Sequence, residues 1–318
     1  MDDWRPSASL RILRERAALL AAVRNFFHRR GVLEVDTPLL AAHTVSDPAL
    51  RPLVVATSAA STQPRYLQTS PEYAMKRLLA AGSGPIYQIC HAFRDEEQGR
   101  RHNPEFTLLE WYRPGFDLQA LMAEVAELIL PLLGRARSHC YRYREIFFEV
   151  LAIDPFTATD RELAGAARRC ADIGGIDGDR DLWLDLLMSH AVEPALAGRG
   201  VVFIHDYPAS QAALARIERA DGVDVAARFE LYIDGVELAN GFHELADARE
   251  QARRFERDNR ARRAQGLPEH RADPRLLAAL AHGLPDCSGV ALGLDRLLML
   301  LCGAASLSEV MAFNWQRS

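Results

Sequence analysis

Two acidic residues seven positions apart are the first candidates for chemistry. The sequence alternates like a strand on both sides of the Asp-Gly pair at 234–235, which is a favoured two-residue hairpin turn. In such a hairpin Tyr232 pairs with Glu237 and Glu230 pairs with Ala239, so both glutamates share one face as diagonal neighbours, about 7–8 Å apart. With no evident cationic partner, the pair is suited to a divalent cation such as Mg²⁺ that carries nucleotide phosphates. A solvent-facing acidic pair is the equal alternative.

A second candidate hairpin presents an arginine, a histidine and an aromatic ring. Strand-like residues end at Arg94 and resume at Phe106, and the polar segment 95–105 between them contains His102. Positions two apart on a strand share a face, so Phe106, Glu110 and Tyr112 point to the same side. Arginine clamps phosphates and aromatic rings stack on bases, so a nucleotide site is one interpretation. An exposed loop of solvated charges is the other, and composition alone favours it.

A third segment, 289–296, runs from small residues into an apolar helix. Glycine in a strand, such as Gly293, permits the close approach of a ligand or of another backbone. Arg296 falls in the first helical turn and needs an anionic partner, which is either a ligand or the neighbouring Asp295. The glycine spacing matches neither the dinucleotide nor the P-loop pattern, so this segment alone is weak evidence.

Arginines between 249 and 263 raise the question of RNA binding. Three acid-to-base pairs at i,i+4 spacing occur in this segment: Glu250–Arg254, Glu256–Arg260 and Asp258–Arg262. Pairs in this orientation stabilise a helix, so a solvated helix is the preferred interpretation.

The elements that must position these residues follow from periodicity and turn signals. Helices are predicted at 10–27, 118–133 and 246–265, and strands at 32–38, 86–94, 106–112, 201–204, 228–233 and 236–240, with a strand leading into a helix over 290–302. Strands outnumber any β-α-β alternation, which favours an α+β fold with an antiparallel sheet flanked by helices. One domain over residues 1–318 with a peripheral insertion at about 135–200 is the simplest organisation.

Bulk properties exclude several classes of protein. The net charge is −5, which argues against a strongly cationic nucleic-acid clamp. The N-terminus has no signal-peptide pattern, and the most apolar stretch, 284–302, contains charged residues, so no membrane segment is expected. Five scattered cysteines without a C-x-x-C pair fit reduced thiols in the cytoplasm.

Three ordered segments together resemble the signature motifs of class II aminoacyl-tRNA synthetases. Residues 31–38 (GVLEVDTP) resemble motif 1, FRDE at 93–96 with RHNPEFTLLE at 101–110 resembles motif 2, and 289–296 resembles motif 3. TSPE at 69–72 and ELANGFHE at 237–244 resemble the lysine-specific subgroup. Segments 66–77, 208–211, 266–268 and 285–293 are most similar to stand-alone paralogues that attach (R)-β-lysine to elongation factor P. Two features separate the chain from true lysyl-tRNA synthetases: no segment is left for an anticodon-binding OB domain, and Ala291 replaces a glycine.

The resemblance implies a role for each matching residue. Arg94 would bind the α-phosphate of ATP, and Arg94 and Arg296 would be the catalytic residues. The implied ATP-binding residues are Arg94, Asp95, Glu96, His102, Asn103, Phe106, Glu237, Leu238, Gly293 and Arg296. The implied amino-acid-binding residues are Ser70, Pro71, Glu72, Tyr112, Glu244 and Ala291. Glu230 and Glu237 would bind Mg²⁺, and Asp95 departs from the asparagine that is common in the family.

The implied activity is formation of an aminoacyl-adenylate from ATP and a lysine-like amino acid, followed by transfer to a lysine of elongation factor P. A homodimer through motif 1, and no use of tRNA, are part of the same expectation. Three alternatives remain open: a compact lysyl-tRNA synthetase, a non-catalytic regulatory module with a synthetase fold, and a ligase that acts on a small amine.

Overall fold

The computed structural model describes residues 4–56, 64–172 and 174–318. The chain forms two compact units: unit 1 comprises Met1–Gly115 and Ala246–Ser318, and unit 2 comprises Phe116–Leu245. Each unit carries strands and helices of its own, and each is described by itself below. The predicted insertion at about 135–200 falls wholly inside unit 2, and the organisation as one domain stays a prediction.

Unit 1 is built on four strands in the order β1-β5-β6-β12. Their bounds are Leu33–Glu34 (β1), Ile86–Phe93 (β5), Glu105–Pro114 (β6) and Cys287–Gly293 (β12). Strands β5, β6 and β12 are antiparallel, whereas β1 runs parallel to β5. The strand predicted at 32–38 is therefore much shorter than expected, and Pro38 explains part of this because proline cannot donate a ladder hydrogen bond.

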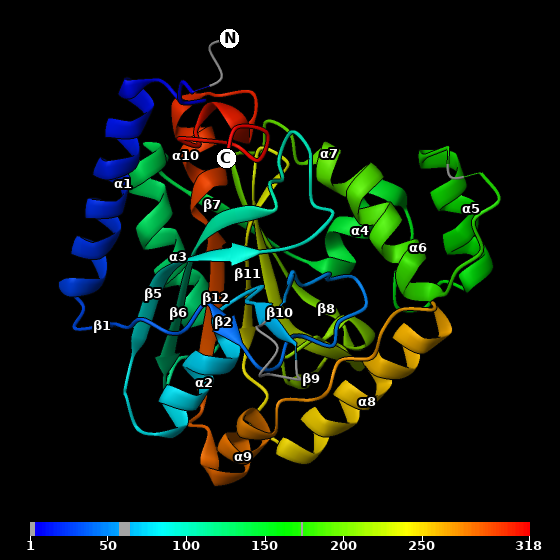
Figure 1. Ribbon diagram of the computed structural model, residues 1–318. Helices are drawn as coiled ribbons and strands as arrows, with labels where there is room; N and C mark the ends of the chain where they lie inside the picture. The colour runs from blue at the N-terminus through cyan, green and yellow to red at the C-terminus, as the bar shows by residue number, and fades with distance from the viewer. Residues whose placement is uncertain (1–3, 57–63, 173) are drawn as a thin grey trace. The chain divides into compact units, whose positions relative to one another are not determined.

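Helices and a small second sheet complete unit 1. The second sheet has the order β2-β4-β3, with bounds Leu40–Ala41 (β2), Val54–Val55 (β3) and Arg65–Leu67 (β4). The helices are α1 (Leu10–His28), α2 (Glu72–Ala80), α8 (Ala248–Ala264), α9 (Pro274–Gly283), α10 (Leu294–Cys302) and the 3-10 turn η3 (Leu307–Glu309). Figure 1 shows β12 continuing directly into α10, as the sequence predicts.

One face of the unit 1 sheet is covered by α1. The Phe27 ring of α1 stacks on Tyr87 of β5 at 4.4 Å and meets Trp111 of β6 edge-on at 5.3 Å. Side chains alternate along a strand, so Gln88 and Glu110, one residue before Trp111, belong to the opposite face. The sheet therefore has a packed aromatic face and a second face that is free to carry polar groups.

Unit 2 contains strands in the order β11-β10-β8-β7, with β9 paired to β10. The bounds are Ser138–Arg142 (β7), Val201–Pro208 (β8), Ile217–Ala220 (β9), Val223–Ile233 (β10) and Val236–His243 (β11). Its helices are α3 (Leu118–Leu133), α4 (Tyr143–Leu151), α5 (Asp160–Cys170), α6 (Arg180–Leu187), the π-helix η1 (Met188–Val192), α7 (Glu193–Ala195) and the 3-10 turn η2 (Ala209–Gln211). Buried residues of α4, α5 and α6 form one apolar core with residues of β8 and β10.

The arginine-rich helix α8 differs from the solvated helix that its charge pattern predicts. The Glu250–Arg254 pair is confirmed at 3.1 Å, but Arg254 and Arg262 are each only 3% exposed. Arg262 donates to backbone carbonyls, among them that of Pro268 at 2.6 Å, and Asp258 accepts from Ser46 at 2.7 Å. Half of the predicted charge pattern therefore anchors the helix to unit 1 instead of facing water.

Candidate functional site

The polar face of the unit 1 sheet carries the first cluster of predicted site residues. Glu110 of β6 lies directly opposite Gln88 of β5 and Ala291 of β12 in the strand register. Tyr112, two residues further along β6, shares this face. We call this group and the residues that bond to it the acidic pocket: Ser70, Glu72, Lys76, Gln88, Glu110, Tyr112 and Ala291.

Glu110 is the centre of the hydrogen bonds in the acidic pocket. The Ser70 hydroxyl donates to Oε2 at 2.7 Å and the Tyr112 hydroxyl donates to Oε1 at 2.8 Å. Glu110 is 2% exposed, and burial raises the pKa of its carboxyl from 4.5 to about 7, with the charge of Glu72 as the second cause. The charge of Lys76 lowers this pKa by less than burial raises it, and Lys76 pairs with Glu72, so Glu110 is a suitable partner for a bound ammonium group.

Glu72 approaches Glu110 from the start of α2. Pro71 precedes it as the N-cap residue, and the Ser70 hydroxyl accepts the Glu72 backbone N–H at 3.0 Å. The Glu72 carboxylate pairs with Lys76 at 2.7 Å, and Lys76 is only 2% exposed. The sequence Ser-Pro-Glu therefore sets a turn and a helix start that hold Glu72 and Ser70 beside the same strand.

Glu110 was not among the predicted site residues, although Ser70, Glu72, Tyr112 and Ala291 all meet in its neighbourhood. The signal was present, because strand alternation places Glu110 on one face with Phe106 and Tyr112. A carboxylate on such a face, with apolar Leu109 and Trp111 beside it in sequence, is buried and needs partners.

A second cluster in unit 1 gathers the predicted nucleotide-binding residues of β6, its preceding loop and α10. The Arg94 guanidinium lies over the Phe106 ring at 5.1 Å, and Arg94 also meets Glu97 at 3.6 Å. Arg296 donates to the backbone carbonyl of Arg101 at 3.3 Å and lies 2.8 Å from His102 Nε2. The structure thus brings two arginines and a ring close to one loop, which is the composition of an anion and base site.

The protonation of His102 follows from these neighbours. Desolvation, and next the charge of Arg296, lower the pKa of His102 from 6.5. A neutral imidazole has one ring nitrogen that accepts, which matches the contact from Arg296 to Nε2.

The remaining loop residues are held by local bonds. Asn103 donates to the Glu105 carbonyl at 2.6 Å, and its side-chain oxygen accepts the Trp315 N–H at 3.1 Å. Asp95 accepts the Glu96 N–H at 2.9 Å, and Glu96 has a positive φ of 62° and pairs with Arg51. Both Asp95 and Glu96 are exposed, and their roles toward a nucleotide stay predictions.

Asp295 is paired with a residue that sequence proximity does not reveal. Its carboxylate accepts from Arg16 of α1 at 2.5 Å and from the Thr107 backbone N–H at 2.6 Å, and Arg16 also donates to the Thr107 hydroxyl at 2.6 Å. The alternative in which Asp295 neutralises Arg296 is therefore wrong. Arg296 instead contacts the loop at 101–102.

Gly293 ends β12 on the polar face of the sheet, opposite Leu108. The three atoms nearest to a Cβ added there are carbons of Arg296 at 3.8 Å, which is ordinary van der Waals contact. Packing of the described residues therefore does not require glycine at this position, in keeping with space reserved for a ligand.

In unit 2 the hairpin turn has the predicted form, with φ of 49° at Asp234 and 80° at Gly235. A side chain at Gly235 would also come within 2.7 Å of the Glu193 carbonyl, so glycine is required here. Ile233–Val236 and Tyr232–Glu237 pair as predicted.

The predicted Glu230–Ala239 pairing is wrong, because the register shifts between Leu231 and Tyr232 and Glu230 pairs with Asn240 instead. A β-bulge of this kind adds one residue to one strand, here β11, so alternation along β10 is unchanged. Glu230 and Glu237 still share a face, since Tyr232 lies two residues from the first and opposite the second.

Glu230 is not without a cationic partner. It pairs with Arg228 and accepts from the hydroxyls of Tyr207 at 2.6 Å and Tyr232 at 2.5 Å. This corrects the premise that the two glutamates repel each other unless a metal is present. A carboxylate has about four lone-pair sites, so Glu230 keeps capacity for one metal contact, and half-buried Glu237 is the more accessible ligand.

Leu238 and Glu244 follow on the same hairpin. Leu238 is 3% exposed and Glu244 is 2% exposed. Glu244 lies just beyond β11 and forms an isolated bridge with Ala215, flanked by the Leu245 N–H to Leu214 bond at 3.0 Å. The backbone of Glu244 is thus fixed despite the Asn240-Gly241 pair that obscured its position in the sequence.

No group of three or more His, Cys, Asp and Glu side chains suited to a metal occurs among the described residues. This is compatible with Mg²⁺, which is typically held by one or two carboxylates and by substrate phosphates. The described residues also contain no helix with the length and apolar character of a membrane span.

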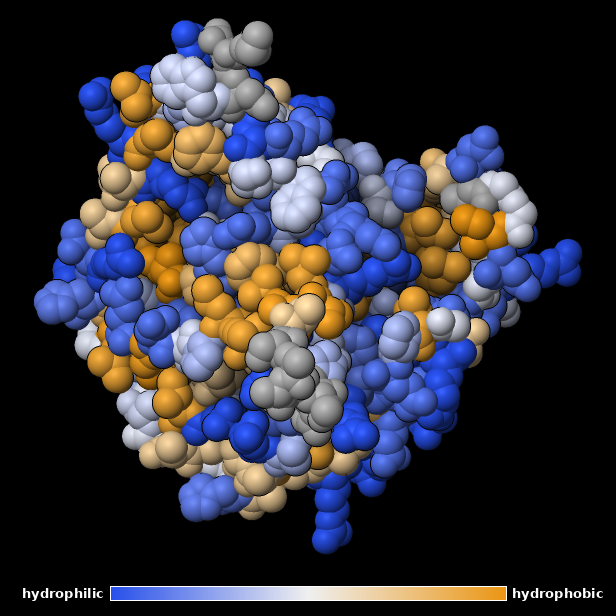
Figure 2. Space-filling model, in the orientation of Figure 1, coloured by the Kyte–Doolittle hydropathy of each residue, from blue (hydrophilic) through white to orange (hydrophobic). Residues whose placement is uncertain are grey.

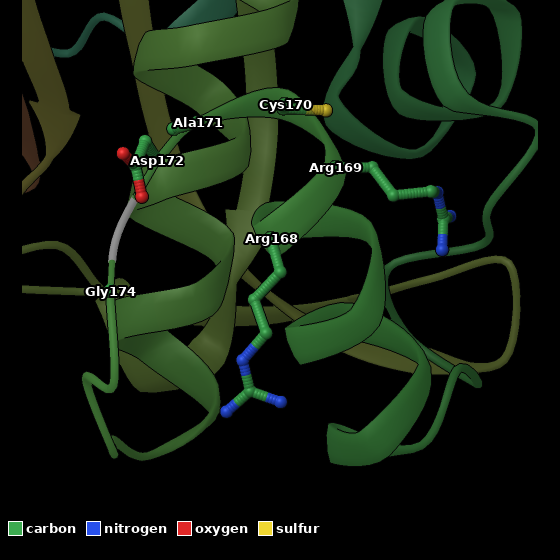
Figure 3. A pocket seen from close by; sticks show the side chains of 6 residues that line it. All are labelled: Arg168, Arg169, Cys170, Ala171, Asp172 and Gly174. Atoms are coloured by element: carbon green, nitrogen blue, oxygen red, sulfur yellow. The ribbon is translucent and has the colours of Figure 1, made fainter.

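A surface pocket at the end of α5 lies apart from every predicted site residue. Its lining residues are Arg168, Arg169, Cys170, Ala171, Asp172 and Gly174. Figure 3 shows the side chains of Arg168, Arg169 and Asp172 pointing in different directions. Polar groups that diverge do not define a ligand, so this pocket is not a candidate site.

Comparison with known proteins agrees with this arrangement. Residues 1–317 match the family described as tRNA synthetases class II (D, K and N). The chain is 51% identical over 320 residues to the elongation factor P--(R)-beta-lysine ligase of Salmonella paratyphi B, covering 99% of this chain and 98% of that protein. It is 51% identical over 323 residues to the ligase of the same name from Edwardsiella ictaluri, covering 100% and 99%. The chain belongs to the class II tRNA synthetase family.

Proposed function

We propose that this protein activates (R)-β-lysine with ATP and transfers it to a lysine side chain of elongation factor P. The observation that carries the proposal is the acidic pocket of this class II synthetase fold. Its buried residues Glu110 and Tyr112 are suited to bind the cationic end of an amino acid. The names of the relatives that are 51% identical over 98–99% of their length supply the β-isomer and the acceptor.

Two steps account for the activity. In the first, a carboxylate oxygen of the amino acid attacks the α-phosphorus of ATP, and the bond to pyrophosphate breaks to give an aminoacyl-adenylate. In the second, a neutral lysine amine attacks the carbonyl carbon of the adenylate, loses a proton, and expels AMP. Neither step needs a nucleophilic side chain of the enzyme, so alignment and charge stabilisation are its contribution.

Arg94 is the proposed α-phosphate ligand. Its guanidinium lies 5.1 Å from the centre of the Phe106 ring, on which adenine would stack, so the proposed phosphate ligand and the proposed base platform are neighbours. Arg296 and neutral His102 would bind the outer phosphates, with Asn103 holding the loop through Glu105 and Trp315.

The other proposed contacts follow the same assignment. Glu96 and Asp95 would meet the adenine side, and Leu238 and Gly293 would border the nucleotide. Glu237 and Glu230 would hold Mg²⁺, which when bound would neutralise phosphate charge. Glu72 would meet the amine near the carboxylate, while Tyr112, Glu110 and Glu244 would meet the terminal amine, with Ser70, Pro71 and Ala291 shaping the pocket.

A homodimer through α1 and β1 is part of the proposal. Leu10 and Leu33, which begin these elements, are 67% and 56% exposed, and Leu40 and Val54 of the small sheet are 43% and 63% exposed. Figure 2 shows apolar surface at the place where Figure 1 draws β2. Apolar surface of this kind supports association of two copies. The five cysteines are free thiols, which supports a reducing compartment such as the cytoplasm.

ATP–pyrophosphate exchange with purified protein tests the first step. (R)-β-lysine should support faster exchange than α-lysine, and label from the product should pass to elongation factor P and not to tRNA. Efficient charging of tRNA with α-lysine would instead identify a compact lysyl-tRNA synthetase. Failure to activate any amino acid would favour the regulatory module.

Glu244→Gln gives a sharper test of the amino-acid site. Loss of one negative charge should raise the KM for the amino acid about 10-fold or more while leaving the KM for ATP within about 2-fold. Exchange kinetics equal to those of the wild type would remove Glu244 from the site.

A further inference from the structure

Gln88 is a buried amide in the acidic pocket that none of the predicted roles uses. It lies on β5 directly opposite Glu110, on the face that also carries Tyr112 and Ala291. Directly opposed residues of an antiparallel pair have Cβ atoms about 4.5–5.5 Å apart, so the Gln88 side chain lies beside that of Glu110. It is 1% exposed, so bulk solvent does not reach it.

Both polar atoms of this amide lack a hydrogen-bond partner within the described part of the chain. Buried amides without partners are rare and destabilise a fold, so they mark places where a further group binds. One neighbour on the same face is the Cys90 thiol, whose pKa burial raises to about 12. Contacts from the Gln68 and Gln88 amides offset part of this rise, but a neutral thiol is a weak partner, and it is the Gln68 amide that donates to the sulfur, at 3.3 Å.

The charged neighbours in the pocket have other partners. Glu110 accepts from Ser70 and Tyr112, and Glu72 pairs with Lys76. Two carboxylates and one ammonium are therefore already buried together, and a third carboxylate at position 88 would raise the pKa of Glu110 further. A neutral amide supplies an oxygen acceptor without that added charge.

We infer that Gln88 is a specificity-determining residue whose side-chain oxygen accepts a hydrogen bond from the terminal ammonium of the bound diamino acid, beside Glu110. An ammonium has three N–H donors, and Glu110 and Glu244 are the two carboxylates proposed for it. The Tyr112 hydroxyl already donates to Glu110, so the Gln88 oxygen would be the third acceptor. The inference rests on the proposed function, since it names a residue of the same amino-acid site.

The empty protein and the complex should respond in opposite directions to Gln88→Met. Methionine has a similar size and removes two unpaired polar atoms, so the empty variant should melt at a temperature equal to or above that of the wild type. The ammonium loses an acceptor, so the KM for (R)-β-lysine in exchange should rise about 10-fold while the KM for ATP stays within about 2-fold.

Gln68→Met is the matched control. The Gln68 amide is buried to a similar extent but is bonded to Cys90 Sγ and to the His91 carbonyl at 2.9 Å. This variant should melt at a lower temperature than the wild type, because it removes satisfied bonds, without a selective effect on the amino acid. A purely structural role for Gln88 would give the same result in both variants.

The outcomes separate the two claims. If wild-type protein activates (R)-β-lysine and Gln88→Met has the same KM for it, the assignment of Gln88 is overturned and the proposed function stands. A lower melting temperature of the empty Gln88→Met variant, with both KM values raised, would also overturn it. If wild-type protein activates no amino acid, the proposed function itself fails.

Discussion

Replacing Arg16 with methionine should destabilise unit 1 from a position outside the proposed substrate contacts. Arg16 joins α1 to two residues that adjoin the nucleotide cluster: Asp295 precedes Arg296, and Thr107 follows Phe106. The variant removes both hydrogen bonds that Arg16 donates. The Asp295 side chain, which is 3% exposed, then keeps its bond from the Thr107 N–H.

The magnitude follows from the burial of the pair. Breaking a buried ion pair by removing one partner costs about 3–5 kcal/mol. The Arg16 side chain is 23% exposed, so the lower end, about 3 kcal/mol, is expected. At about 2.1 cal/mol/K per residue, the 318-residue chain has an unfolding entropy of about 0.7 kcal/mol/K, and Tm should fall by about 4–5 °C.

Arg24→Met on the same helix is the control. Arg24 pairs with Glu34 at 3.0 Å, but the two side chains are 49% and 42% exposed, so the free energy of unfolding should change by less than about 1 kcal/mol. Urea unfolding followed by circular dichroism measures both variants. Adding Asp295→Asn to Arg16→Met should recover part of the loss, because the stranded charge is gone. The reasoning is refuted if Arg16→Met and Arg24→Met are equally stable, or if the two changes at Arg16 and Asp295 are additive.

Three further predictions concern the proposed site. Amino-acid binding, measured as KM in exchange, should strengthen between about pH 6 and pH 8, because Glu110, with its pKa raised from 4.5 to about 7, must ionise to bind an ammonium; Glu110→Gln should flatten this profile. Without substrate, the free energy of unfolding should instead fall as pH rises from 4.5 to about 7, because folded Glu110 holds its proton more tightly than unfolded Glu110. If the free energy of unfolding of Glu110→Gln falls with pH as steeply as that of the wild type, this prediction is contradicted. Arg296→Gln should raise the pKa of His102 measured by NMR titration, since Arg296 is its second depressing cause after desolvation, and should raise the KM for ATP about 10-fold. Ala291→Gly should lower the KM for α-lysine relative to that for β-lysine by about 10-fold without changing the KM for ATP. An unchanged ratio would show that the methyl group of Ala291 does not discriminate between the two isomers.

Local patterns in the sequence predict the elements of this fold well. The helix predicted at 118–133 matches α3, and the Asp-Gly turn has the expected positive φ values. These features depend on residues close in the chain, where periodicity and turn chemistry act directly. The bulge between Leu231 and Tyr232 is not visible in the sequence, because alternation continues on either side of it.

Side-chain contacts between residues far apart in the chain were not predicted from the sequence. Asp295 and Arg16 are 279 positions apart, so proximity suggested Arg296 instead. Arg228, in contrast, lies two residues before Glu230 on the same strand face, and strand alternation alone could have identified this partner. Glu110 was on the predicted face, but its role depends on Ser70 from another segment.

The small residues on the side of β12 that faces Glu110 affect how substrate preference can change during evolution of this family. Positions 289, 291 and 293 present glycine, alanine and glycine to that face, so pocket volume there is set by backbone and single methyl groups. A single base change in the codon for Ala291 gives glycine and alters this volume without touching the arginines and aromatic ring of the nucleotide cluster. Descent within the family can therefore exchange one amino acid for another in small steps while the adenylate chemistry is inherited intact.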